Sequence, residues 1–185
     1  MEREDNKTMI SETLFYIIVN SLFWLVVHFA SGLIVHFIPP KFYSTKTWLF
    51  KKRWWEFDGK LYTKIFFVKK WKDKLPEAGE FYKINPFNKK RLKSREKSYL
   101  ERFLLETCRA ELAHLIPILA FPLCLPWNPG AGKWIMLAYA VLFNLPFIII
   151  QRYNRIRLAK LLQYYDLKQK ISNYINTKVN YISNQ

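Results

Sequence analysis

The sequence predicts an all-α integral membrane protein with three transmembrane helices and interfacial amphipathic helices on the cytoplasmic side. The 25 residues 14–38 contain no Asp, Glu, Lys or Arg. Two further apolar runs, 110–127 and 134–150, follow a strongly basic middle segment. Because a helix needs about 20 apolar residues to cross roughly 30 Å of hydrocarbon, the first run spans easily and the later two just suffice.

Charge is unevenly distributed along the chain and predicts its topology. Lys and Arg outnumber Asp and Glu by 20 to 8 in residues 41–109 and by 7 to 1 in residues 151–185. Residues 1–13 carry four acidic and two basic side chains. Basic loops stay in the cytoplasm, so the middle segment and the C-terminal tail are expected there and the N-terminus outside. The acidic start and the long apolar run predict a retained anchor rather than a cleavable signal peptide.

Length and cysteine usage limit what else the chain contains. With three spans in 185 residues there is no room for a separate soluble domain, so residues 1–185 are expected to form a single membrane domain. Cys108 and Cys124 are separated by most of a membrane helix, and no disulfide between them is expected. The three histidines do not form a ligand cluster, so neither a metal nor another cofactor is expected.

Residues 48–71 alternate bulky aromatic side chains with Lys and Arg. Aromatic rings favour the boundary between lipid headgroups and acyl chains, and lysines attract anionic lipid phosphates. A basic strip with interleaved aromatic rings also suits single-stranded nucleic acid, through stacking and phosphate contacts. Because the strip directly follows a membrane anchor, we favour the lipid surface and expect no nucleic-acid partner.

Two stretches outside the spans have the periodicity of amphipathic helices. Apolar residues recur at helical spacing from 91 to 108, which predicts a helix that runs into the second span. Pro, Gly and Asn residues between 76 and 86 mark breaks before it. The same spacing recurs from 158 to 165 among basic residues, and the tail is expected to return along the cytoplasmic surface.

Glu111 is a carboxylate inside a predicted span, and His114 follows three residues later on the same helix face. An ionisable group in hydrocarbon is by default a functional hypothesis, because its burial is costly. A carboxylate beside an imidazole fixes its tautomer and stabilises its protonated form, as a general base requires. Alternatively, both residues lie at a shallow depth in the membrane and pair with Arg109, and they then have no functional role. Cys108 is a less favoured candidate, as the carrier of a thioester intermediate.

The third span ends in a polar cluster that contains Gln151, Arg152, Asn154, Arg155 and Arg157. Guanidinium groups grip phosphate in a planar, bidentate way, so this cluster and Arg109 form a candidate substrate-binding set for a phosphorylated donor. A positive-inside stop signal is the alternative interpretation. Asn144, in the middle of the third span, is expected to hydrogen-bond across helices as a packing contact.

Three strings of the sequence resemble one known family. They are RAELAH at residues 109–114, QRYNRIRL at residues 151–158 and VKKWKDKLP at residues 68–76. In this order and spacing they resemble the glycosyl-4,4′-diaponeurosporenoate acyltransferases. The resemblance implies a bacterial membrane enzyme that places a fatty acyl chain on the sugar of a carotenoid glycoside, the last step to staphyloxanthin. Leu115 and Ile156 depart from the family pattern and are expected to reshape the acceptor pocket.

The residues and the resemblance together predict an acyltransferase of the bacterial cell membrane. The expected reaction moves a fatty acyl group from a thioester donor, on CoA or acyl carrier protein, to a hydroxyl of a lipid-linked acceptor such as a glycosylated carotenoid. We expect His114 to act as general base, Glu111 to orient it, the arginines to hold the donor, and Gln151 or Asn154 to donate to the oxyanion. The alternative is a non-enzymatic scaffold that binds anionic lipid or a partner protein. The sequence does not indicate the oligomeric state.

Overall fold

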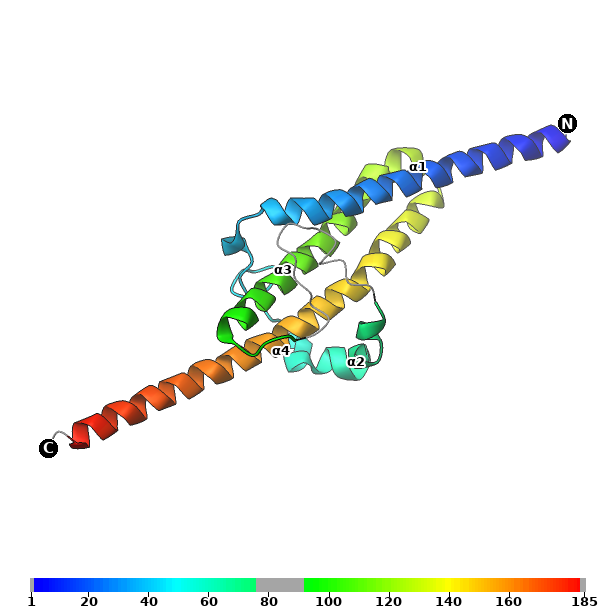
Figure 1. Ribbon diagram of the computed structural model, residues 1–185. Helices are drawn as coiled ribbons and strands as arrows, with labels where there is room; N and C mark the ends of the chain where they lie inside the picture. Colours follow the sequence, from blue (N-terminus) through cyan, green and yellow to red (C-terminus); the bar gives the residue numbers. More distant parts are fainter. Residues whose placement is uncertain (1, 76–91, 184–185) are drawn as a thin grey trace. The chain divides into compact units, whose positions relative to one another are not determined.

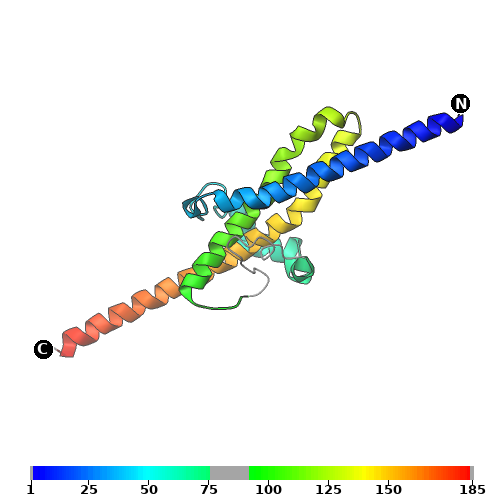
Figure 2. The ribbon, with the colours of Figure 1, turned by 45° about the horizontal axis from the view of Figure 1, so that its top comes forward.

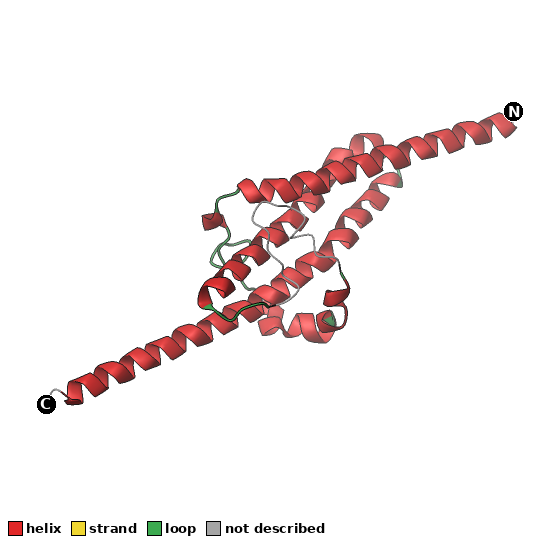
Figure 3. Cartoon of the chain, in the orientation of Figure 1, coloured by secondary structure: helices red, strands yellow, loops and turns green. Residues whose placement is uncertain are grey.

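The computed structural model describes residues 2–75 and 92–183, and these residues form helices and connecting turns without a strand (Figures 1 and 3). The α-helices are α1 (Glu2–Phe37), α2 (Val68–Trp71), α3 (Lys97–Ala120) and α4 (Gly132–Ser183). Shorter 3₁₀ and π turns lie between them: η1 (Pro40–Phe42), η2 (Trp54–Gly59), η3 (Leu61–Ile65), η4 (Lys72–Lys74) and η5 (Phe121–Trp127). The predicted all-α class is confirmed.

Three helical segments are long and apolar enough to cross a membrane, which confirms the three predicted spans. They are Met9–Phe37, Lys97–Trp127 and Gly132–Ile182. The first span ends at Phe37, just before two prolines, because proline lacks a backbone N–H and restricts the residue that precedes it. The second begins in α3 and tightens into η5, where Pro122 and Pro126 are incompatible with a continued α-helix.

The amphipathic stretch before the second span and the span itself form one helix, because α3 runs from Lys97 to Ala120 without a break. The breaks predicted between 76 and 86 lie outside the described residues. The tail differs from expectation: instead of turning back after residue 150, it continues α4 to Ser183. Residues 147–183 contain neither Gly nor Pro, so nothing in them ends the helix. Amphipathic periodicity indicates which side of a helix is apolar, but not where the helix bends.

The described residues divide into two compact units. The first contains residues 2–39 and 109–149, and the second contains residues 40–75, 92–108 and 150–183. In the first unit, α1 packs against η5 and the first half of α4. Its buried centre is formed by Trp24, Cys124 and Ala140, with half-buried aromatic rings around it.

The second unit is built on the pairing of α3 with α4. Leu100 and Phe103 of α3 pack against Leu158 and Leu162 of α4, and the two helices lie side by side there in both views (Figures 1 and 2). The turns between α1 and α3 belong to this unit as well. They supply buried polar side chains that the sequence did not single out.

Candidate active site

In the first unit, the imidazole of His114 is held by an amide. Its Nδ1 lies 3.0 Å from Oδ1 of Asn144, and Nδ2 of Asn144 donates to the carbonyl of Ala140 at 2.9 Å. Since the amide nitrogen is committed to that carbonyl, Oδ1 is the acceptor and Nδ1 of His114 carries the proton. The basic lone pair of the neutral ring is therefore on Nε2.

Packing holds the His114 ring in place. Phe147 stacks on it, with the ring centroids 4.5 Å apart and the planes 7° from parallel. Asn144 is fully buried, so its hydrogen bonds are shielded from water. The sequence treated Asn144 as a packing residue, and the structure makes it the partner that selects the His114 tautomer.

Glu111 and Arg109 lie earlier on α3 and are both buried. Glu111 and His114 are three residues apart, so they lie on the same face of α3, as the sequence indicates. The carboxylate–imidazole couple stays a prediction, because the structure shows Asn144 as the partner of Nδ1.

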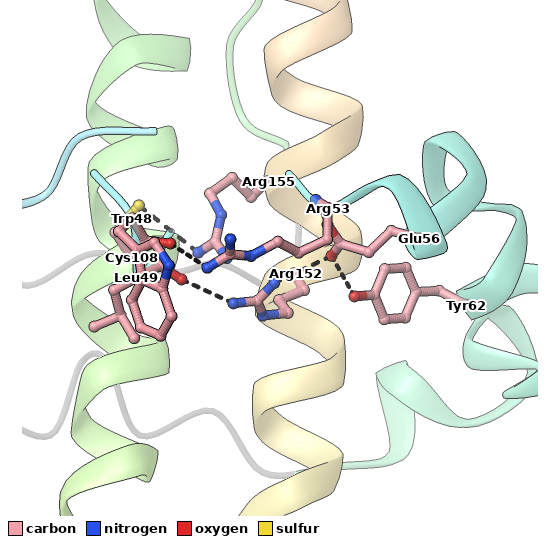
Figure 4. Close-up of polar contacts among 8 residues, drawn as sticks. All are labelled: Trp48, Leu49, Arg53, Glu56, Tyr62, Cys108, Arg152 and Arg155. Carbon is pink, nitrogen blue, oxygen red and sulfur yellow. Dashed lines mark hydrogen bonds and ion pairs between the residues drawn. The ribbon is translucent and has the colours of Figure 1, made fainter. Parts of the chain in front are cut away.

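In the second unit, a buried carboxylate organises several polar groups. Glu56 in η2 has 1% of its surface exposed. Its Oε1 accepts hydrogen bonds from the Tyr62 hydroxyl at 2.5 Å and from Nη1 of Arg152 at 3.3 Å. Its Oε2 accepts from the backbone N–H of Arg53. Figure 4 shows this carboxylate between Tyr62 and Arg152.

Three guanidinium groups gather beside the loop before η2 (Figure 4). Arg152 also donates to the Leu49 carbonyl at 2.8 Å, and Arg53 donates to the Trp48 carbonyl at 2.6 Å. Arg155 is buried, and its Nη1 lies 3.7 Å from Sγ of Cys108. Guanidinium groups held in place by a carboxylate and by backbone carbonyls suit an anionic ligand, because they are oriented before it binds.

The polar residues that end the third span do not all point the same way. Arg152 and Arg155 belong to the Glu56 cluster, whereas Arg157 is exposed and stacks over the Tyr153 ring at 5.3 Å. Gln151 is buried, and its Oε1 has no hydrogen-bond partner within the described residues. A buried acceptor of this kind is costly unless a donor reaches it, and a ligand hydroxyl or amide would supply one.

Sequence reasoning missed Glu56, Tyr62 and Arg53. A signal was present, because Glu56 and Asp58 are the two acidic residues within the basic strip 48–71. Their environments differ. The exposed Lys52 ammonium donates to Asp58 and lowers the pKa of that carboxyl, with Lys160 acting in the same direction. Among the described residues, no three His, Cys, Asp or Glu side chains gather as metal ligands would.

Comparison with known proteins decides the family. The family model described as glycosyl-4,4′-diaponeurosporenoate acyltransferase matches residues 46–164. The chain belongs to the glycosyl-4,4′-diaponeurosporenoate acyltransferase family. The matched residues begin after α1, and they include His114 and Glu56 together with the partners described above. The chain is therefore an acyltransferase, and its three apolar helices fit a membrane protein.

Relatives that carry the family's name occur in several strains of Staphylococcus aureus. Those of strains bovine RF122 / ET3-1, USA300 and NCTC 8325 / PS 47 are each 37% identical over 126 residues. The aligned part covers 68% of this chain and 75% of each relative. No solved structure matches this chain.

Proposed function

We propose that the protein transfers a fatty acyl group from a thioester donor to a sugar hydroxyl of a membrane-held carotenoid glycoside. The names of the relatives supply the acceptor class, because they describe acyl transfer to glycosyl-4,4′-diaponeurosporenoate. The three apolar helices support a membrane setting, in which both an acyl chain and a carotenoid dissolve. The observation that carries the catalytic part is the hydrogen bond between His114 and Asn144.

In the proposed chemistry, His114 is the general base. Nε2 takes the proton of the acceptor hydroxyl as its oxygen attacks the thioester carbonyl, so a C–O bond forms. The tetrahedral intermediate collapses, the C–S bond breaks, and the proton passes from His114 to the leaving thiolate. Asn144 keeps Nδ1 protonated throughout, and Glu111 favours the transient imidazolium. This route needs no covalent enzyme intermediate.

For donor binding we assign the arginines of the second unit. Arg152 and Arg155 hold anionic groups of the donor, such as the phosphates of CoA or of the carrier-protein arm. Glu56 and the Leu49 carbonyl fix the plane of the Arg152 guanidinium in advance, which lowers the entropic cost of binding. Gln151 accepts from a donor amide or hydroxyl.

The remaining polar residues keep the secondary roles that the sequence indicated. Asn154 donates to the developing oxyanion, and Arg109 and Arg157 strengthen the positive field that attracts the donor.

The experiment that tests the base compares two histidines of the first unit. Purified wild type, His114→Gln and His28→Gln are assayed with glycosyl-4,4′-diaponeurosporenoate and either palmitoyl-CoA or palmitoyl acyl carrier protein. His28 is the control, because its ring also packs against a phenylalanine of α4, Phe143, at 5.0 Å between centroids, although tilted by 50° and not stacked. We expect kcat to fall about 100-fold or more in His114→Gln and to hold in His28→Gln. Normal turnover by His114→Gln would overturn the proposal.

We further propose that the N-terminus lies outside and the C-terminus in the cytoplasm, so that the reaction uses cytoplasmic donor. The distribution of Lys and Arg supports this orientation. A membrane-impermeant maleimide applied to intact cells should label Asn6→Cys, which precedes the first span, and should leave Ser183→Cys, which follows the third, unlabelled until the cells are opened. The reverse pattern would contradict the orientation.

A further inference from the structure

Aromatic side chains between α1 and α2 fall into two sets in the structure. Tyr43, Phe50 and Tyr62 are buried. Another set faces outward, with 75% of Trp48, 84% of Trp54, 57% of Phe57 and 51% of Phe67 exposed. We call this outward set the aromatic surface. Large rings with this exposure are unfavourable in water, and several of them in one short segment indicate an interaction site.

The backbone conformation of two of these residues also indicates that the exposed rings have a function. Phe57 and Phe67 have φ angles of 44° and 48°, in the left-handed region that bulky L-residues rarely adopt. Burial does not compensate for the unfavourable backbone, because both rings are more than half exposed. Unfavourable backbone conformations persist where they position a functional side chain. Here they direct two phenyl rings away from the protein.

The charge around the aromatic surface is strongly positive. Residues 41–71 contain nine Lys and Arg against two acidic residues, and one of these, Glu56, is buried among arginines. The lysines of this segment are exposed. Individual rings are paired with cations, since Arg53 lies 4.7 Å over the Trp48 ring and Lys70 lies 5.0 Å over the Phe67 ring. Rings beside cations match the chemistry of an anionic lipid headgroup layer.

Chain connectivity keeps the start of this segment close to the end of the first candidate span. The first candidate span ends at Phe37, and the second unit starts at residue 40. A chain extends by at most about 3.6 Å per residue, so Phe42 lies within roughly 18 Å of the end of the span. Single-stranded nucleic acid would also be attracted by rings and lysines, but a lipid surface is within reach and needs no further partner.

We propose that the aromatic surface of Trp48, Trp54, Phe57 and Phe67 lies in the headgroup layer of an anionic leaflet. The rings rest at the boundary of the acyl chains, and the surrounding lysines contact lipid phosphates. One turn, η2, links this surface to the arginine cluster, because Trp54 and Phe57 face outward while Glu56 between them faces inward. Lipid contact therefore also fixes the turn that holds Arg152.

The test measures the depth of single sites in the full-length protein. Spin labels on Trp54→Cys and Phe57→Cys are compared with a label on Asn176→Cys, an exposed polar position of α4. The native cysteines are both fully buried and do not compete for the label. The protein is reconstituted into vesicles of phosphatidylcholine in which about one third of the lipid is anionic phosphatidylglycerol. The collision rates of each spin label with oxygen and with a water-soluble nickel chelate are then measured.

The expected result is nickel collision at 54 and 57 at least about threefold below that at 176, with oxygen collision raised. In vesicles of phosphatidylcholine alone the two labels should lie closer to water, because the lysines lose their partners. Equal depth in both lipids would overturn the anionic preference.

Three other outcomes would overturn the proposal itself. Nickel collision at 54 and 57 equal to that at 176 would mean a surface in water. Dipolar coupling between labels at 54 on two chains, with nickel excluded, would mean an interface with a second copy. Protection that occurs only when oligo-deoxythymidine is added would mean a nucleic-acid surface.

Discussion

The amide side chains of Asn20 in α1 and Asn128 after η5 exchange two hydrogen bonds, 2.9 and 2.8 Å long. Both residues are buried, and Trp127 also donates to Asn20 at 3.0 Å. Asn20→Leu removes these partners and leaves the Asn128 amide buried without them. We expect a loss of about 1–3 kcal/mol in the free energy of unfolding, measured by thermal denaturation in detergent.

The second half of this test removes both amides. In Asn20→Leu/Asn128→Leu no amide of the pair is left without its partner, so the double variant should lose less than the sum of the two single losses. Asn176→Leu, at an exposed position of α4, is the matched control and should hardly change the denaturation midpoint. Additive losses would show that the two amides do not act as a pair.

Hydropathy and charge were enough to predict the helical class and the three spans, because both are properties of single segments. The pairing of His114 with Asn144 could not be predicted in the same way. The two residues are 30 positions apart, and their contact depends on the register between two helices, which periodicity does not specify. The sequence could indicate that each polar side chain in a span needs a partner, but not which one.

Asn144 offers a direct test of the tautomer. In Asn144→Leu the Nδ1 proton of His114 loses the Asn144 acceptor, so this contact no longer favours the tautomer with its lone pair on Nε2. We expect kcat to fall about tenfold or more while the KM for the acceptor holds. Asn144→Asp restores an acceptor of similar shape and should recover most of the turnover. Wild-type kcat in Asn144→Leu would show that the amide only packs the two helices.

The Glu56 cluster was missed for a related reason. Between the spans the sequence shows a basic strip, in which one acidic residue is easily read as a solvated charge. Burial reverses that interpretation, because a carboxylate with 1% exposure must be paired with cations and hydroxyl donors. Its partners, Tyr62 and Arg152, come from η3 and α4, and no local pattern connects them.

Substitution of Glu56 should separate a positioning role from a purely structural one. Glu56→Leu removes the acceptor of the Tyr62 hydroxyl and of the Arg152 guanidinium, and should cost about 3–5 kcal/mol of unfolding free energy. Glu56→Gln keeps the shape but not the charge, so it should fold and should raise the KM for the thioester donor more than it lowers kcat. Asp58→Asn, whose carboxylate is exposed, is the control. An unchanged donor KM in Glu56→Gln would leave Glu56 a structural residue only.

Gly59 tests the turn that carries Glu56. Its φ is +91°, and it follows Phe57 and Asp58, which also have positive φ. A Cβ at Gly59 would meet Ile156 Cγ2 at 3.5 Å, an ordinary contact, so Gly59→Ala should cost only backbone strain, about 1–2 kcal/mol.

Two other glycines serve as controls for this prediction. Gly130, at φ +58° with open space around it, should cost as much, whereas Gly132→Ala in α4 should not destabilise the protein, since its φ is not positive. A lowered midpoint in Gly59→Ala and Gly132→Ala, with Gly130→Ala unchanged, would show that space and not backbone conformation decides these positions.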